Sequence, residues 1–294
     1  MNIAPIDLAR VDWPRVDRST YLVHQQMTYA YPTPIDALNH RLVVFPPRHH
    51  GDQRRVTYRL DVSGVEHQEL ERRDAFGNVV VELVAPRVES RIKFEAWIVM
   101  ERRGGERPHR VHGAWLTDRR LLDASPLAAP DESLRTAAAA LACGPGGPRG
   151  VAERINEWVH AQMTYAPGST DVTTTAAQAL AQGAGVCQDY AHVMIALARL
   201  CGLPARYVSG HLVGEGAMHA WVEVLLPGTC GAGEGVAWPF DPTHCRGTSM
   251  SYLTVAVGRD FTDVSPTRGS FRAASPGRLS SRQTVSLTGV SYRG

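Results

Sequence analysis

Cys187 stands where a cysteine side chain could act as a nucleophile. In "GVCQDYAHVMIALARLCG" (185–202) it follows a glycine turn and precedes a long apolar run. The run predicts a helix that begins at the cysteine, and the first turn of a helix has unpaired N–H groups and the positive end of the backbone dipole. Both favour the thiolate, which is the nucleophilic form. The alternative is a packing role, because cysteines beside apolar helices are commonly part of the core.

His219 and Asp241 could complete a site for nucleophilic attack on an amide carbonyl. His219 lies in "MHAWVEV" and opens a predicted strand, and Asp241 lies in "WPFDPTH" at the end of the next one. A histidine beside a thiolate can act as general base and acid, and a carboxylate can accept a hydrogen bond from its Nδ1–H and orient the ring. Such a set forms a thioester and releases an amine. Taken alone, the aspartate also fits turn chemistry.

Other polar residues near these three have predicted roles of their own. Trp221, two residues along the strand from His219, is expected to share its face and to wall the site as a substrate-binding residue. Asp189 and His192 are expected to turn away from Cys187 and to hydrogen-bond with solvent or the core. Cys201, at the other end of the same helix, is expected to be a packing cysteine.

Two further clusters of residues each allow a structural interpretation and a functional one. A metal site with His219 would draw on Cys230, His244 and Cys245. The sequence has no C-x-x-C pair and no helical H-x-x-x-H there, so we expect neither a metal nor a cofactor. An ion-paired brace or, less simply, an arginine clamp for a substrate carboxylate is expected from Arg259, Asp260, Asp263 and Arg268.

The elements that position these residues follow two patterns. Short alternating or β-branched runs at 20–31, 39–46, 54–64, 78–86 and 92–102 predict antiparallel strands. Helices are predicted at 131–143, with Asp131 as N-cap, at 151–165 and at 187–202, with a polar connection over 166–185. Strands are predicted at 204–214, 218–228, 235–243, 251–258 and 282–292. This order indicates an α+β fold with a β-rich N-terminal domain (1–125) and a catalytic domain with a β-rich C-terminal segment (126–294).

Composition excludes several classes of protein. The chain has 294 residues, 44% of them hydrophobic, and a formal charge of +2, which is ordinary for a globular protein and offers no nucleic-acid surface. No signal-peptide core and no run of about 18 apolar residues occurs, so no membrane association is expected. The five irregularly spaced cysteines fit a reducing compartment, the cytoplasm.

Four linked motifs resemble a known family. "GVCQDYAH", "GLPARYVSGH", "MHAWVEV" and "WPFDPT", in this order, are similar to the core of the transglutaminase-like superfamily of Cys-His-Asp enzymes, which includes transglutaminase-like cysteine proteases. "RRDAFGN" (72–78) and "GRDFTDVSPTRG" (258–269) resemble its bacterial branch, which has an N-terminal domain. The resemblance implies a papain-like core with a central helix on an antiparallel sheet. It also implies that Cys187 is the nucleophile, His219 the general acid and base, and Asp241 the orienting group.

The same residues leave the reaction open between related activities. A peptidase or amidase acting on a peptide or protein substrate is the leading expectation, because water is always available to resolve a thioester. Acyl transfer from protein glutamine to amines, as in transglutaminases, is the alternative, and a non-catalytic binding module that keeps the fold is another. The Cys187 backbone N–H is the expected oxyanion donor. The bacterial resemblance also suggests a functional link to an ATP-dependent peptide ligase.

Overall fold

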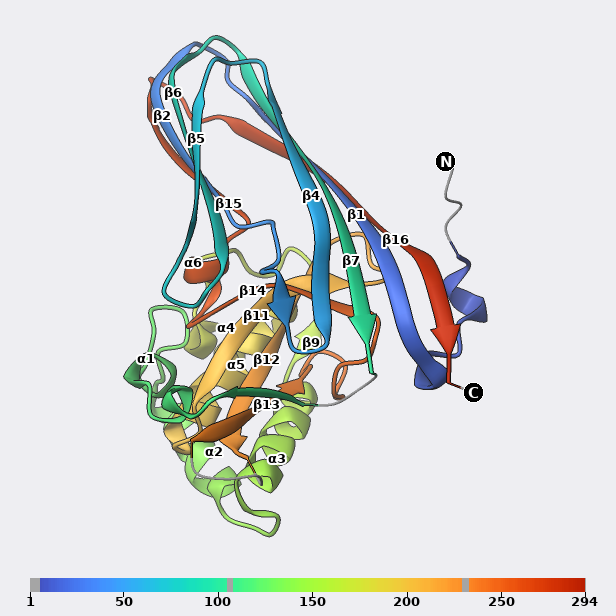
Figure 1. Ribbon diagram of the computed structural model, residues 1–294. Coiled ribbons are helices and arrows are strands. Elements are labelled where there is room, and N and C mark those ends of the chain that lie inside the picture. The colour runs from blue at the N-terminus through green and yellow to red at the C-terminus, as the bar shows by residue number, and fades with distance from the viewer. Residues whose placement is uncertain (1–5, 105–107, 229–232, 294) are drawn as a thin grey trace.

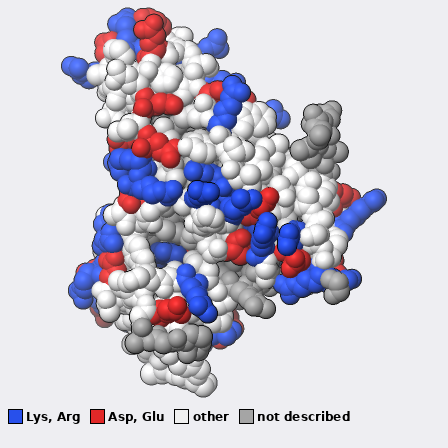
Figure 2. All heavy atoms as spheres, in the orientation of Figure 1, with Lys and Arg blue, Asp and Glu red and all other residues white. Residues whose placement is uncertain are grey.

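The computed structural model describes residues 6–104, 108–228 and 233–293, and it has the α+β class that the sequence predicts. Strands form the upper part of the molecule in Figure 1, and helices gather around a third sheet in the lower part. No helix among the described residues is long and apolar enough to cross a membrane. Basic and acidic side chains are interspersed over the face shown in Figure 2, in keeping with the nearly balanced charge.

Two antiparallel sheets form the β-rich part. Their orders are β16-β1-β7-β4-β3 and β15-β2-β6-β5. Alternate side chains of both sheets, among them Tyr21, Leu83 and Phe94, meet in one apolar core. The strands are β1 (Val16–Ala30), β2 (Ile35–Leu42), β3 (His49–His50), β4 (Gln53–Ser63), β5 (Gln68–Arg73), β6 (Val79–Val88), β7 (Arg91–Arg103), β15 (Thr267–Arg272) and β16 (Arg278–Tyr292).

The third sheet has helices on one face and the β-rich part on the other (Figure 1). Its order is β14-β11-β12-β13-β8, and the buried helix α5 packs on β11 and β12 inside a ring made by α2, α3 and α4. The strands are β8 (His109–His112), β11 (Ala205–Leu212), β12 (Met218–Pro227), β13 (Glu234–Phe240) and β14 (Tyr252–Gly258). The main helices are α2 (Glu132–Ala142), α3 (Gly147–Gln162), α4 (Ala176–Gln182) and α5 (Cys187–Leu200).

Shorter elements connect these layers. They are η1 (Leu8–Arg10), η2 (Trp13–Arg15), η3 (Gly113–Leu116), α1 (Arg119–Leu122), β9 (Thr164–Tyr165), β10 (Ala184–Gly185) and α6 (Phe261–Val264). The polar connection predicted over 166–185 is wrong in part, because α4 lies within it. Its N-cap Thr175 and Gln178 form a capping box that starts the helix.

The sheets cross the boundary expected at residue 125. The C-terminal strands β15 and β16 join the two N-terminal sheets, and β8 joins the sheet of the core. β16 pairs with β1 along almost its whole length, which covers an edge that would otherwise present unpaired N–H and C=O groups. The tail after residue 266 is therefore part of the β-rich layer and not of the core.

Side-chain amides from the β-rich part seal the edge strand β14. Gln53 donates through Nε2 to the Thr254 carbonyl (2.7 Å) and accepts from the Thr254 N–H (2.9 Å). Asn78 makes the same pair of bonds with Val257, at 2.7 and 2.8 Å. Asp74 in turn fixes Asn78 by accepting from its N–H and its amide. The β-rich part thereby takes the place of a missing neighbour strand.

Replacing Asn78 by alanine should destabilise the fold strongly. The change leaves the buried Val257 N–H and C=O without partners, and each such group costs about 1–3 kcal/mol, so we expect a loss of about 2–4 kcal/mol in the free energy of unfolding. Urea unfolding measures it. The matched control is Asn39→Ala on the exposed face of β2, which should stay within about 0.5 kcal/mol of wild type. Equal effects of both changes would refute the edge-sealing role.

Acid should destabilise the protein through buried histidines. Burial lowers the pKa of His40, His109, His192 and His211 to about 4. Unfolded histidine titrates near 6.5, so the unfolded state binds more protons below that pH. This stability is therefore fully present above pH 6.5 and is lost as the pH falls toward 4, on the order of 1–2 kcal/mol per histidine by pH 5.

Urea midpoints at pH 7.5, 6 and 5 measure this loss. His211→Phe should flatten the pH dependence, whereas the exposed His49→Phe should leave it unchanged. A stability maximum near pH 5 would contradict the assignment of neutral buried imidazoles.

Candidate active site

Cys187 is the first residue of α5, as the sequence predicts. The chain reaches it through a tight turn, since Gly183 ends α4 in the left-handed conformation with φ of 65°. The Cys187 side chain is half-buried and lies at the positive end of a fourteen-residue helix whose first N–H groups have no acceptor within the helix. This position favours a thiolate and offers N–H donors to an adjacent oxyanion.

Asp189 holds the start of α5 in place. Its Oδ2 accepts from the Val186 N–H (2.8 Å) and from the Thr170 hydroxyl (2.6 Å). A Cβ on Gly185 would lie 2.6 Å from that oxygen, so only glycine fits there. Asp189 is buried, and the buried His192 accepts from the Phe261 N–H, so both residues make core hydrogen bonds, as expected.

His219 lies between Cys187 and Asp241. It is the second residue of β12, it is 3% exposed, and its Nε2 is 2.8 Å from Asp241 Oδ2. Burial alone would lower its pKa, but hydrogen bonds with Asp241 and Cys187, together with their charges, raise the pKa of His219 to about 10. The ring is therefore an imidazolium at neutral pH, and it can stabilise a thiolate on Cys187.

The ring orientation differs from the sequence prediction. Asp241 is bound by Nε2 and not by Nδ1, so Nδ1 is the nitrogen on the open side, 3.5 Å from Glu215 Oε2. β12 and β13 are antiparallel neighbours, and Asp241 directly follows β13. The far end of the imidazole therefore reaches the carboxylate across the strand, and the nitrogen nearer the backbone is left for the reaction.

Asp241 is a fully buried carboxylate with donors on both oxygens. Oδ1 accepts from the N–H groups of Thr243 and His244 in the turn after β13. Oδ2 accepts from His219, from His244 Nδ1 (2.8 Å) and from the Tyr252 hydroxyl (2.6 Å). Burial would raise the pKa of Asp241, but these hydrogen bonds outweigh it and hold the pKa well below its usual range. Asp241 thus keeps its negative charge beside His219.

Three further residues of the site were not predicted in this role. Tyr252 and His244 share the Asp241 carboxylate with His219, and Glu215 lies 3.5 Å from His219 Nδ1 and 3.6 Å from His244 Nε2. His244 follows Asp241 by one turn, and this spacing is the only signal that could have indicated it. Tyr252 and Glu215 reach the site from a strand and a loop that only the tertiary structure brings there.

Trp221 lies beside His219 but away from solvent. Its ring is 6.1 Å from the imidazole, and it is 2% exposed. Gly210 allows this packing, because a Cβ there would lie 2.4 Å from the indole. Trp221 therefore braces His219, and its buried ring offers no open surface to a substrate.

The remaining candidate residues are accounted for as follows. The Cys201 thiol ends α5 and donates to the Ala138 carbonyl, and burial raises the pKa of Cys201. Cys230, one of the residues considered for a metal site, lies outside the described residues. Two of the other residues considered for a metal site, His219 and His244, lie next to Asp241. The nitrogen and oxygen atoms of these three side chains that could bind a metal are within 4.8 Å of one another.

The acidic and basic stretch near α6 forms a brace. Arg259 pairs with Asp263 (2.8 Å), and the buried Asp260 caps α6 and accepts from the Leu127 N–H (3.1 Å). Arg268 lies on β15 and is paired in register with Arg41. The stretch thereby ties α6 to the segment before α2.

Comparison with known proteins places this chain in a family. The family model of the transglutaminase-like superfamily matches residues 135–240, which include Cys187 and His219 and end next to Asp241. The model of the bacterial transglutaminase-like N-terminal region matches residues 21–101. Together they match more than half of the chain.

Curated relatives and a solved structure are also similar to this chain. An uncharacterized protein of Mycobacterium leprae is 38% identical over 134 residues, covering 42% of this chain and 45% of that protein. One of Mycobacterium tuberculosis (strain H37Rv) is 38% identical over 122 residues, covering 38% of each. The chain thus spans less than half the length of the curated relatives it matches.

The crystal structure of a "putative cysteine protease" from Cytophaga hutchinsonii has the same fold. It superimposes with a TM-score of 0.63 at 18% identity, covering 93% of this chain and 99% of that one. The superposition includes the β-rich part as well as the helical core. The chain belongs to the transglutaminase-like superfamily, with the bacterial transglutaminase-like N-terminal region in front of its core.

Proposed function

We propose that this protein is a thiol enzyme that cleaves amide bonds, with Cys187 as nucleophile, His219 as general acid and base, and Asp241 as orienting group. One observation carries the proposal. The His219 imidazole is held by a buried carboxylate at 2.8 Å on Nε2, and Cys187 at a helix N-terminus contributes to its raised pKa. A peptidase or amidase is the leading form of this activity.

In the first half-reaction the Cys187 thiolate attacks the carbonyl carbon of the amide. A C–S bond forms, and the carbonyl electron pair moves to oxygen, where the Cys187 backbone N–H at the start of α5 stabilises it by about 3 kcal/mol. When the C=O bond re-forms, the C–N bond breaks, and His219 gives its Nδ1 proton to the departing nitrogen. The products are a free amine and a thioester on Cys187.

In the second half-reaction water resolves the thioester. His219, now neutral, takes a proton from the water through Nδ1 as the oxygen attacks the acyl carbon. The C–S bond then breaks and the carboxylic acid leaves, which restores the thiolate beside the imidazolium. Asp241 keeps its charge throughout and stabilises the imidazolium in both halves of the cycle.

Alkylation with iodoacetamide at pH 5.5 tests the activated thiol. We expect Cys187 to react about 10–100 times faster than a free model thiol, since an ordinary thiol is almost fully protonated at that pH. Peptide mapping identifies the modified residue, and the exposed Cys143 is the internal control that should react at the model rate. Equal rates at Cys187 and Cys143 would refute an activated nucleophile.

Acyl transfer to an amine is a second candidate, and Glu215 favours it. Its carboxylate is 39% exposed and lies 3.5 Å from His219 Nδ1, where an attacking amine would give up its proton. A negative charge there would hold a protonated amine close to the thioester. Hydrolysis and transfer can be separated by mass spectrometry of a peptide library incubated with and without a primary amine.

Glu215→Gln should lower the ratio of acyl transfer to hydrolysis by about 3- to 10-fold when the acceptor is a cationic diamine. The reason is that the diamine loses about 1 kcal/mol of attraction to the exposed carboxylate. The product ratio is measured with one peptide at fixed diamine concentration. Glu234→Gln, a similarly exposed glutamate on β13, is the matched control and should leave the ratio unchanged. An unchanged ratio in Glu215→Gln would remove the support for an amine site.

We place this activity in the cytoplasm of a bacterium. The cysteines among the described residues are free thiols, namely Cys143, Cys187, Cys201 and Cys245. Free thiols persist in a reducing compartment, and a thiol nucleophile depends on staying reduced.

A further inference from the structure

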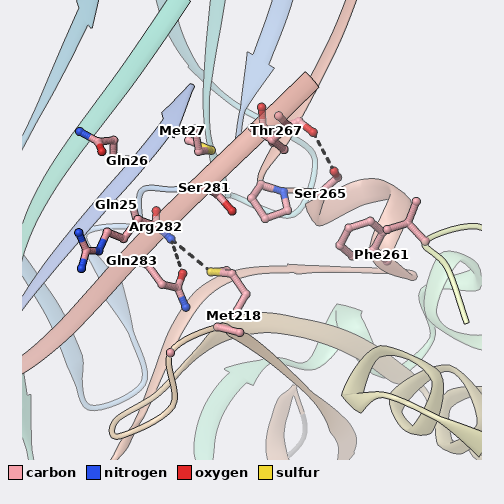
Figure 3. A pocket seen from close by; sticks show the side chains of 15 residues that line it. Gln25, Gln26, Met27, Met218, Phe261, Ser265, Thr267, Ser281, Arg282 and Gln283 are labelled. Atoms are coloured by element: carbon pink, nitrogen blue, oxygen red, sulfur yellow. Dashed lines mark hydrogen bonds between the residues drawn. The ribbon is translucent and has the colours of Figure 1, made fainter. Parts of the chain in front are cut away.

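A cavity of about 410 Å³ lies between the β-rich part and the core (Figure 3). One of its lining residues, Met218, directly precedes His219 in the sequence. β1, β16, the turn before β12 and the segment around α6 surround it. Met27, Met218 and Phe261 give it an apolar lining. Val172 and Leu279 also line it, and they are among the most exposed large apolar side chains, at 59% and 42%. Such a cavity is suited to an apolar side chain.

Two glutamines that line this cavity each have a buried polar atom without a partner among the described residues. Gln25, which is 5% exposed, donates through Nε2 to Gln283 Oε1 (3.2 Å) and to the Met218 sulfur (3.3 Å), as Figure 3 shows. Gln25 Oε1 and Gln283 Nε2 are buried and have no partner among the described residues. This buried acceptor and buried donor have hydrogen-bonding capacity that the described residues leave unused, and a ligand in the adjoining cavity could use it.

The free donor and acceptor do not depend on how the two amides are turned. Rotating both by 180° reverses the hydrogen bond between Gln25 and Gln283 and exchanges which residue offers the donor. One donor and one acceptor remain free in either arrangement. The chemical character of the cavity is therefore fixed.

The protein already uses this chemistry on an extended backbone. Gln53 satisfies the N–H and C=O of Thr254, and Asn78 satisfies those of Val257. In an extended chain the N–H and C=O of one residue point to the same side, so a donor and acceptor pair can bind both. The Gln25–Gln283 pair offers the same two groups to an incoming peptide.

The position of the cavity connects it with the thiol site. Residues 216–218 line it and lead directly into His219. Val172 lies in the loop that is anchored through Thr170 to Asp189, two residues after Cys187. A peptide that extends from the cavity along residues 216–218 would reach the neighbourhood of His219. Arg282 alone among the described lining residues carries a charge, which disfavours a basic side chain.

We propose that this cavity is the peptide-binding subsite of the enzyme. It takes an apolar residue of an extended substrate peptide, whose own N–H and C=O pair with Gln25 and Gln283, and it discriminates against lysine or arginine at that position. The inference rests on the proposed function for what happens to the peptide, but peptide binding can be tested without turnover.

The test measures binding of capped tripeptides to the Cys187→Ser protein by calorimetry. Acetyl-Ala-Leu-Ala-amide should bind about tenfold more tightly than its N-methyl-leucine analogue, which lacks the leucine N–H. It should also bind about tenfold more tightly than the same peptide with lysine in place of leucine. The double change Gln25→Leu and Gln283→Leu should abolish the preference for the N–H. Gln68→Leu on the exposed strand β5 is the control and should keep it.

Ser281→Trp gives a second readout that does not remove a buried group. Ser281 is an exposed residue of the cavity wall, so tryptophan there should fill the space and weaken binding of the leucine peptide about tenfold or more. Melting curves check that each variant is folded. Equal binding of all three peptides, no binding at millimolar concentration, or binding unaffected by Ser281→Trp would overturn the subsite.

The two proposals can fail separately. Selective peptide binding by a protein whose Cys187 alkylates no faster than Cys143 would refute the thiol enzyme and keep the subsite. Fast alkylation and peptide cleavage with unchanged KM in Ser281→Trp would refute the subsite and keep the enzyme.

Discussion

Replacing Cys187 by alanine should abolish the proposed amide-bond cleavage, by at least about 10⁴-fold in kcat, because the thioester would have no sulfur on which to form. The measurement is turnover of a peptide substrate identified from the library. The variant should keep its melting temperature within a few degrees, since the side chain is half-buried and removal of one sulfur at the end of a helix leaves little empty space.

Cys201→Ala is the matched control for this change. Cys201 follows the last residue of the same helix, where the dipole disfavours a thiolate, and burial raises its pKa. The kcat of Cys201→Ala should therefore stay within about threefold of wild type, which corresponds to a change of less than about 1 kcal/mol in the activation free energy. The comparison separates the chemistry of the sulfur from the packing of α5, because the two cysteines share one helix and differ in which end they occupy.

A Cys187→Ala protein that retained every activity of the wild type would contradict the thiol enzyme. It would favour a binding module that keeps the fold without turnover. Partial activity of the variant preparation that disappears when this preparation is treated with iodoacetamide would instead indicate that contaminating wild-type enzyme is present. Mass spectrometry of the purified variant resolves that case.

The sequence predicts those parts of the fold that rest on local patterns. The continuous apolar run after Cys187 predicts α5, and the acidic residue before an alanine-rich stretch predicts the Asp131 cap, which accepts from the Leu134 N–H. The local pattern also contains a signal for α4, because Thr175 and Gln178 have the spacing of a capping box. β5 could not be found, because all of its residues are exposed and it has no alternating pattern.

Local sequence patterns do not predict which strands pair when they are far apart in the sequence. A run such as 282–292 predicts a strand, but nothing in its alternation says that its partner is β1, more than 250 residues away. The same limit applies to the site. Cys187, His219 and Asp241 could be predicted from their positions at element ends, whereas the ring orientation of His219 and the contribution of Tyr252 depend on how β11 to β14 pack.

The β-rich part holds the segment that carries Tyr252. The Tyr21 hydroxyl donates to the Met250 carbonyl, and Arg102 donates to the carbonyls of Ser249 and Tyr252. These bonds come from β1 and β7 and fix the start of β14, from which Tyr252 donates to Asp241. The N-terminal region therefore supports the carboxylate that orients His219, in addition to forming one wall of the cavity.

Asp241→Asn should lower kcat by about 10²–10⁴-fold while leaving the protein folded. The asparagine carbonyl can still accept from the N–H groups of Thr243 and His244, so the turn after β13 is kept. Its NH₂ group, however, would replace the oxygen that accepts from His219, and it can only donate. His219 must then accept on Nε2 and carry its proton on Nδ1, so the ring is neutral and has no free lone pair toward Cys187.

The loss of the carboxylate also removes a main cause of the raised His219 pKa, which is about 10 in the wild type. Alkylation of Cys187 at pH 5.5 should therefore slow by about tenfold or more, because the imidazolium that stabilises the thiolate is depleted. Asp61→Asn, an exposed aspartate on β4, is the control for loss of one negative charge and should change neither rate. If Asp241→Asn kept both kcat and the alkylation rate while melting at the wild-type temperature, Asp241 would be a structural residue of the turn, and the mechanism would reduce to Cys187 and His219.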